Sequence, residues 1–126
     1  MNSRILVVDD EESILFALTD YLGLRGFEVD YAGSMEQAQA CLAEASYSAV
    51  IADLRLAPDN RPAGLELVAE ARRSCPSTRT LLLTAYRSPG LDEAARQVGV
   101  DRILVKPMPL SEVARVLSEL VEGRGD

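Results

Sequence analysis

Two short aliphatic segments that run directly into acidic residues restrict the fold more than any other feature of the sequence. Ile5–Val8 is followed by the acidic run 9–11, and Ala49–Ala52 is followed by Asp53. An apolar run without alternation is typical of a strand that is buried on both faces. Because burial of an unpaired carboxylate is strongly unfavourable, both strands must reach the surface at their acidic ends. Each segment alone could be an ordinary solvated strand end, but two such strands side by side would form an acidic pocket.

Short apolar strands alternate with amphipathic helices five times along the chain. Apolar residues at helical spacing define the helices, and Ser34, Ser88 and Ser111 each stand where an N-cap is expected. Strands that alternate with helices imply right-handed crossovers and a parallel sheet covered on both faces. The predicted strands are 5–8, 27–32 (at an edge), 49–53, 80–84 and 102–105, and the predicted helices begin near residues 13, 35, 64, 89 and 112.

Length and composition indicate one globular domain. The chain has 126 residues, so we expect a single domain over 1–126 with an ordered core from about 3 to 121. Its net charge of −7 and the lack of a basic run argue against direct nucleic-acid binding by this domain. No segment is apolar for long enough to span a membrane, and the N-terminus lacks the apolar core of a signal peptide. A cytoplasmic location is therefore expected.

Rare residue types exclude several kinds of chemistry. The chain contains no histidine, which rules out an internal Ser-His-Asp triad, a histidine-based zinc site and an internal histidine phosphate carrier. Cys41 and Cys75 stand singly in apolar surroundings, so we expect both to be reduced packing residues. Lys106 is the single lysine beside twelve arginines, and it lies between a predicted strand and a proline. This makes Lys106 a candidate for a role that arginine cannot fill.

Five polar or charged residues follow or end four of the predicted strands. In open parallel sheets the site lies beyond the carboxyl ends of the strands, where the strand order reverses. Each residue also has an ordinary structural explanation, such as a strand end, a helix cap or a lysine extending from a turn. Coincidence at four strand ends is less plausible than a shared site. The rim residues are Asp9, Asp10, Asp53, Thr84 and Lys106.

Such a rim suits phosphoryl transfer assisted by a divalent cation. Crowded carboxylates repel each other, and Mg²⁺ relieves this by binding one or two of them together with phosphate oxygens. Asp9 and Asp10 are the expected metal pair, which leaves Asp53 as a nucleophile toward phosphorus. The ammonium group of Lys106 would neutralise the phosphoryl charge, and the hydroxyl of Thr84 would donate a hydrogen bond to a phosphoryl oxygen.

These residues resemble a known family. Over essentially its whole length the chain resembles the receiver domain of bacterial two-component response regulators. Each motif is weak alone, but together their order and spacing are specific. The matching motifs are Val8-Asp9-Asp10-Glu11, Asp53-Leu54 followed by Gly64-Leu65-Glu66-Leu67, Thr84-Ala85, and Leu104-Val105-Lys106-Pro107.

The resemblance implies a flavodoxin-like α/β fold, a (βα)5 doubly wound sandwich with strand order 2-1-3-4-5. It implies that a histidine kinase or phosphotransfer protein supplies a phosphoryl group to Asp53, and that the domain catalyses its own phosphotransfer and dephosphorylation. It further implies bound Mg²⁺ with the main-chain carbonyl of Arg55 as an additional ligand, and a cis Lys106-Pro107 bond. A homodimer through the fourth helix, fifth strand and fifth helix is also expected.

Two departures from the family pattern affect the expected readout. The segment between Asp53 and Gly64 is about three residues longer than usual in the family. The aromatic residue that usually stands three positions before the lysine is Ile103 here. In the family that aromatic turns inward when the threonine moves toward the phosphate, so Thr84 and Ile103 are the expected switch pair. Tyr86 lies close enough in sequence to modify the readout.

Other functions remain possible from the sequence. The main alternative is a pseudo-receiver, a binding module that keeps the fold and signals without phosphorylation. A phosphatase of the haloacid dehalogenase type would carry a second acid two residues after Asp53, where this chain has Arg55. A dinucleotide-binding enzyme would carry a glycine fingerprint after the first strand, which is absent.

Overall fold

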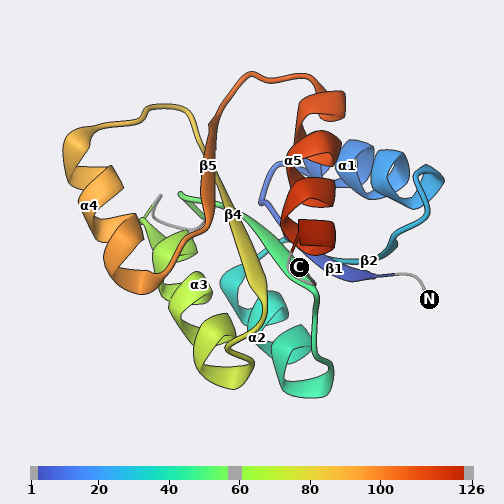
Figure 1. Cartoon of the computed structure of the whole chain (residues 1–126), viewed down its shortest axis with the longest axis horizontal. Helices are drawn as coiled ribbons and strands as arrows, with labels where there is room; N and C mark the ends of the chain where they lie inside the picture. Colours follow the sequence, from blue (N-terminus) through green and yellow to red (C-terminus); the bar gives the residue numbers. More distant parts are fainter. Residues whose placement is uncertain (1–2, 57–60, 124–126) are drawn as a thin grey trace.

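The computed structural model describes residues 3–56 and 61–123, which form a five-stranded parallel sheet covered by helices on both faces (Figure 1). The strand order is β2-β1-β3-β4-β5, which confirms the predicted flavodoxin-like order. The elements are β1 (Arg4–Val8), α1 (Glu12–Leu24), β2 (Glu28–Ala32), α2 (Met35–Glu44), β3 (Ala49–Asp53), α3 (Ala63–Ser74), β4 (Arg79–Thr84), α4 (Pro89–Val98), β5 (Arg102–Val105) and α5 (Leu110–Gly123).

The central strands are apolar on both sides because each contributes to two separate cores. In β1, Ile5 and Val7 pack toward α1 and α5, whereas Leu6 and Val8 pack toward α2 and α3. All four side chains are at most 1% exposed. Because both faces of the strand are buried, a shift in its register would disturb both cores, so the position of the strand in the sheet is well defined. The acidic residues that follow it are thereby placed at a definite height above the sheet.

Side-chain caps begin two of the helices as predicted. Ser34 Oγ accepts the N–H of Gln37 at 3.2 Å, and Ser88 Oγ accepts the N–H of Leu91 at 3.1 Å. Such bonds satisfy amide groups that have no partner within the helix. The starts of α2 and α4 are therefore determined locally.

The prediction that Ser111 caps the last helix is wrong. α5 begins at Leu110, two residues before the predicted start near residue 112, so Ser111 lies within its first turn. The carbonyl of Pro109 accepts the N–H of Glu112 at 3.0 Å, which makes the turn after Pro109 helical before Ser111 is reached. The sequence signal was misleading because serine is also common within first turns.

Other local expectations can be compared with the structure. The Lys106-Pro107 bond is cis, and Cys41 and Cys75 are both free. The predicted long segment 54–63 includes residues 57–60, which lie outside the described residues, as do 1–2 and 124–126. Among the described helices, none is long and apolar enough to cross a lipid bilayer.

The start of α3 packs directly against the backbone that carries Asp53. A Cβ atom on Gly64 would lie 2.4 Å from the Asp53 carbonyl oxygen and 2.9 Å from the Leu54 Cα. The N–H of Gly64 donates to the Leu54 carbonyl at 2.9 Å. Glycine is needed here because the two backbone segments approach too closely for any side chain.

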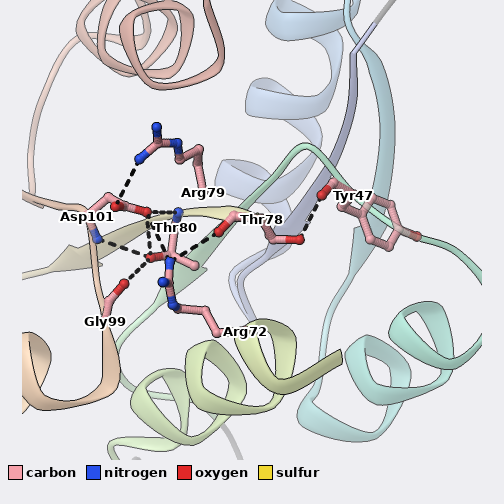
Figure 2. Close-up of polar contacts among 7 residues, drawn as sticks. All are labelled: Tyr47, Arg72, Thr78, Arg79, Thr80, Gly99 and Asp101. Carbon is pink, nitrogen blue, oxygen red and sulfur yellow. Dashed lines mark hydrogen bonds and ion pairs between the residues drawn. The ribbon is translucent and has the colours of Figure 1, made fainter. Parts of the chain in front are cut away.

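A polar network at the opposite end of the strands, where β4 and β5 begin, holds the C-terminal end of α4 in place (Figure 2). The Asp101 carboxylate accepts the N–H of Thr80 at 2.8 Å, and the Thr80 hydroxyl lies 3.1 Å from the Gly99 carbonyl oxygen. Arg72 and Arg79 reach the same carboxylate at 3.8 and 3.5 Å. The network therefore ties the turn after α4 to the beginning of β4 and to the last turn of α3. Nearby, the Thr78 hydroxyl donates to the Tyr47 carbonyl at 2.8 Å.

Two glycine substitutions in helices should change stability in opposite directions. Gly64→Ala should lower the free energy of unfolding by about 1–3 kcal/mol, because its methyl group must displace the Asp53 backbone. Gly23→Ala should raise it by about 0.5–1 kcal/mol, because a Cβ there meets no atom within 4 Å. Urea unfolding of the two variants measures both. A neutral Gly64→Ala variant would show that the approach of α3 to Asp53 is not constrained by this contact.

Candidate functional site

The five rim residues predicted from the sequence lie at the carboxyl ends of the strands. Asp9 and Asp10 follow β1, Asp53 and Thr84 end β3 and β4, and Lys106 follows β5. A cavity of about 610 Å³ is lined by four of them, and Asp9 lies behind it, fully buried. The structure therefore brings together all the residues that the strand-end argument selected.

Three carboxylates form a compact set of oxygen donors. One oxygen each from Asp9, Asp10 and Asp53 lies within 4.8 Å of the others. Asp9 is held by its neighbours, because its Oδ1 accepts the N–H of Glu11 at 2.9 Å and its Oδ2 accepts the Lys106 ammonium at 3.0 Å. Asp10 is exposed at the mouth. A hard divalent cation with oxygen ligands fits this donor set.

Lys106 lies between the carboxylates. Its Nζ is 3.0 Å from Asp9 Oδ2, 3.5 Å from Asp53 Oδ1 and 3.7 Å from Glu11 Oε1. Burial alone would lower the pKa of Lys106, but the hydrogen bond to Asp9 and the charges of Asp53 and Asp9 outweigh it and raise the pKa. The group is therefore an ammonium at neutral pH. The contact with Glu11 was missed in the sequence, where Glu11 read only as part of an acidic run.

Asp53 is destabilised in its ionised form. Its side chain is largely buried, and burial together with the charge of Asp9 raises its pKa to about 6, although Lys106 opposes the shift. Any added positive charge in the cavity would favour the carboxylate over the neutral acid. The site is thus arranged so that a cation and the ionised, nucleophilic form of Asp53 favour each other.

The hydroxyl of Thr84 lines the cavity but already has partners. Its Oγ1 donates to the Tyr86 carbonyl at 3.0 Å and accepts the Tyr86 N–H at 3.2 Å. Tyr86 lines the same cavity, and its side chain is 76% exposed. In the sequence, Tyr86 is linked to the expected switch only by its proximity to Thr84, because no residue pattern reveals which acceptor a threonine hydroxyl selects.

Ile103 and Arg55 were also selected from the sequence. Ile103 on β5 pairs with Leu82 on β4. Together with Arg87 and Ala95 it lines a cavity that is separate from the one that contains Asp53. Arg55 lines the Asp53 cavity, and the role of its main-chain carbonyl stays a prediction. Of the expected switch pair, the structure therefore places only Thr84 in the acidic cavity.

The acidic cavity continues into a surface that the sequence analysis did not single out. We call it the α3–α4 groove, and it is lined by Pro62 and Leu65 at the start of α3 and by Leu91 and Ala94 on α4. The sequence predicts Leu65, Leu91 and Ala94 to be ordinary core positions of amphipathic helices, and Pro62 to belong to the irregular segment before α3. Only the spacing between the two helices shows that they face open space.

The fold and the site together define a flavodoxin-like doubly wound protein with an acidic site where the strand order reverses. The chain belongs to the response regulator receiver domain family, whose sequence model matches residues 5–118. Relatives include the alginate biosynthesis transcriptional regulatory protein AlgB of Pseudomonas aeruginosa (34% identical) and the transcriptional regulatory protein PmrA of Pectobacterium parmentieri (34% identical). The matches cover 96% and 97% of this chain but only 26% and 54% of the two relatives. The chain therefore spans about a quarter to a half of their length.

Solved structures agree with this assignment. A CheY-like response regulator receiver domain protein from Methanospirillum hungatei superposes with a TM-score of 0.91 at 25% identity, covering 99% of this chain and 98% of that one. A response regulator from Burkholderia pseudomallei, solved with a phosphorylated aspartic acid, a calcium ion and citrate, has a TM-score of 0.83 at 28% identity. That match covers 98% of this chain and 72% of the other.

The raised pKa of Asp53 predicts a pH-dependent cost to stability. Its folded-state value of about 6 exceeds the ordinary value of 3.8, so stability is full below pH 4 and declines as the pH rises through 6. Asp53→Asn removes this cost because the amide does not ionise. In the absence of divalent cations, the free energy of unfolding of Asp53→Asn minus that of the wild type should therefore be about 2–3 kcal/mol larger at pH 7 than at pH 4. Urea unfolding in EDTA at the two pH values measures this. Parallel pH profiles would contradict the raised pKa.

Proposed function

We propose that the chain is a phosphoacceptor receiver, in which Asp53 takes a phosphoryl group from the phosphohistidine of a histidine kinase or phosphotransfer protein. The observation that carries the proposal is the position of Asp53 between carboxylates and the one lysine, at 3.5 Å from Lys106 Nζ. A nucleophile toward phosphorus needs an ionisable oxygen, an open approach and nearby positive charge. Asp53 has all three.

In the proposed reaction an ionised oxygen of Asp53 attacks the phosphorus atom. The phosphorus–nitrogen bond of the donor breaks, and the imidazole nitrogen keeps the electron pair and takes up a proton from water. Lys106 holds its ammonium beside the attacking carboxylate of Asp53, where it neutralises charge on the transferred group. The missing histidine of this chain is consistent with a donor supplied by another protein.

Asp9, Asp10 and Asp53 would hold Mg²⁺, with the main-chain carbonyl of Arg55 as a further ligand. Bound Mg²⁺ supplies positive charge to the phosphoryl oxygens. The spacing of the three carboxylates supports this assignment, as does the Burkholderia response regulator, whose structure contains both a phosphorylated aspartic acid and a calcium ion. Asp9 would also position Lys106 through their 3.0 Å hydrogen bond.

Signalling would follow from a change of surface after phosphorylation. We propose that the surface of α4, β5 and α5 serves as a homodimer contact, since Val105 on β5 is 43% exposed. The relatives are transcriptional regulatory proteins that extend well beyond the length of this chain. We therefore also propose that the phosphorylation state of this domain controls an output function, as the names of these relatives suggest for transcription.

The central test is the phosphoryl adduct itself. After incubation with Mg²⁺ and acetyl phosphate, intact-mass spectrometry should show one phosphoryl group on the wild-type chain. Asp53→Asn should abolish the adduct, because an amide oxygen cannot act as the nucleophile. Lys106→Met should reduce the rate of adduct formation by about tenfold or more, because one charge-stabilising group is lost.

Two controls make the result specific. EDTA should abolish the adduct on the wild type, and Asp20→Asn, which changes an exposed carboxylate on α1, should leave it unchanged. A wild-type chain without an adduct at saturating acetyl phosphate and Mg²⁺ would contradict the proposal. It would favour the pseudo-receiver, which signals through protein contacts alone.

A further inference from the structure

The helix beside the acidic site is attached firmly at one end only. Of the ten residues of α4, only Ala95 is buried, and its main packing partner is α3. Its C-terminal end is held by the network around Asp101 and Thr80 (Figure 2). Its N-terminal half lies over the α3–α4 groove, which opens into the Asp53 cavity. Any rearrangement next to Asp53 is therefore expected at the N-terminal end of α4 and in the loop before it.

Tyr86 stands in that loop in an unfavourable position for an aromatic side chain. It is 76% exposed, although it lines the same cavity as the apolar Leu65, Leu91 and Ala94. Aromatic side chains gain most from burial against apolar surfaces. What holds Tyr86 at the rim is the Thr84 hydroxyl, which binds both its N–H and its carbonyl.

A single hydroxyl proton cannot serve two acceptors. Thr84 Oγ1 has one proton to donate, and in this structure the proton goes to the Tyr86 carbonyl at 3.0 Å. If the hydroxyl turns to a phosphoryl oxygen on Asp53, that bond must break. The loop at Tyr86 then loses the contact that holds it in its present conformation.

We propose that Tyr86 is the mobile aromatic residue of this domain, and that phosphorylation of Asp53 moves its side chain into the α3–α4 groove. The inference rests on the proposed function, because the phosphoryl group is what draws Thr84 away. Ile103 lines a different cavity and has no aromatic ring, so it does not supply this movement. The occupant of the groove is thus a residue of the chain itself.

The absence of tryptophan from the chain allows a direct test. Tyr86→Trp introduces a single tryptophan at the site, which can be excited selectively in the presence of the remaining tyrosines. With Mg²⁺ and acetyl phosphate, its emission should shift to shorter wavelength and acrylamide quenching should fall by about twofold, because the indole leaves water. Mg²⁺ alone should cause neither change. Intact-mass spectrometry of the same sample measures the phosphoryl adduct.

Filling the groove should separate phosphorylation from the movement. In the Tyr86→Trp background, Ala94→Phe should leave the phosphoryl adduct in place but keep the indole exposed. Ala94→Leu is the smaller alternative, should phenylalanine disturb folding, and it should reduce the fluorescence response to a lesser extent. Ala40→Phe, at an exposed position on α2, is the matched control and should preserve the full response.

The outcomes distinguish the two proposals. An adduct without a change in quenching would overturn the role of Tyr86 and leave the phosphoacceptor function intact. A full response in both Ala94 variants would place the indole somewhere other than the groove and would also overturn the inference. No adduct at all would overturn the proposed function, and the role of Tyr86 with it.

Discussion

The repulsion among Asp9, Asp10 and Asp53 is the constraint on which the site depends. Three carboxylates with oxygens within 4.8 Å of each other are unfavourable unless positive charge lies among them. Among the described residues, Lys106 supplies such charge through its contacts with Asp9 and Asp53, and Asp10 lies exposed at the mouth of the cavity. Burial, together with the charge of Asp9, raises the pKa of Asp53 to about 6 against the opposing effect of Lys106. A cation bound among these carboxylates therefore favours the ionised form of Asp53.

The rest of the fold keeps these groups at fixed distances in spite of their repulsion. Asp9 follows a strand that is buried on both faces. The backbone of Asp53 packs against the start of α3, so closely that a side chain at Gly64 would clash with the Asp53 carbonyl oxygen. Neither carboxylate can move away without disturbing a core. Packing of the fold therefore keeps the carboxylates close together in spite of their repulsion, and a cation or a phosphoryl group can bind there without rearrangement of the strands.

The strands and the rim could be predicted because both are determined by local patterns and by the geometry of parallel sheets. Asp9, Asp53 and Lys106 follow apolar strands, and such strands end at the same edge whatever the details of packing. The cap of α5 and the location of Ile103 could not be derived in this way. The first depended on which of two neighbouring turns became helical, and the second depended on which residues surround β5 in three dimensions. Hydrogen bonds such as that from Thr84 to Tyr86 depend on atomic positions that no residue pattern specifies.

The polar network and the α3–α4 groove give α4 two unlike ends. At Gly99 a Cβ atom would lie 2.6 Å from Arg72 Nε, so the turn there is closely packed in addition to being hydrogen-bonded. At Ser88 the helix begins beside open space, and the Thr84 hydroxyl binds both the N–H and the carbonyl of Tyr86 in the preceding loop. A conformational change that follows phosphorylation of Asp53 is therefore expected at the open N-terminal end of α4 and not at its closely packed C-terminal end. A domain without the usual aromatic residue at position 103 can still transmit the state of Asp53, provided that the moving part lies in the loop that Thr84 holds.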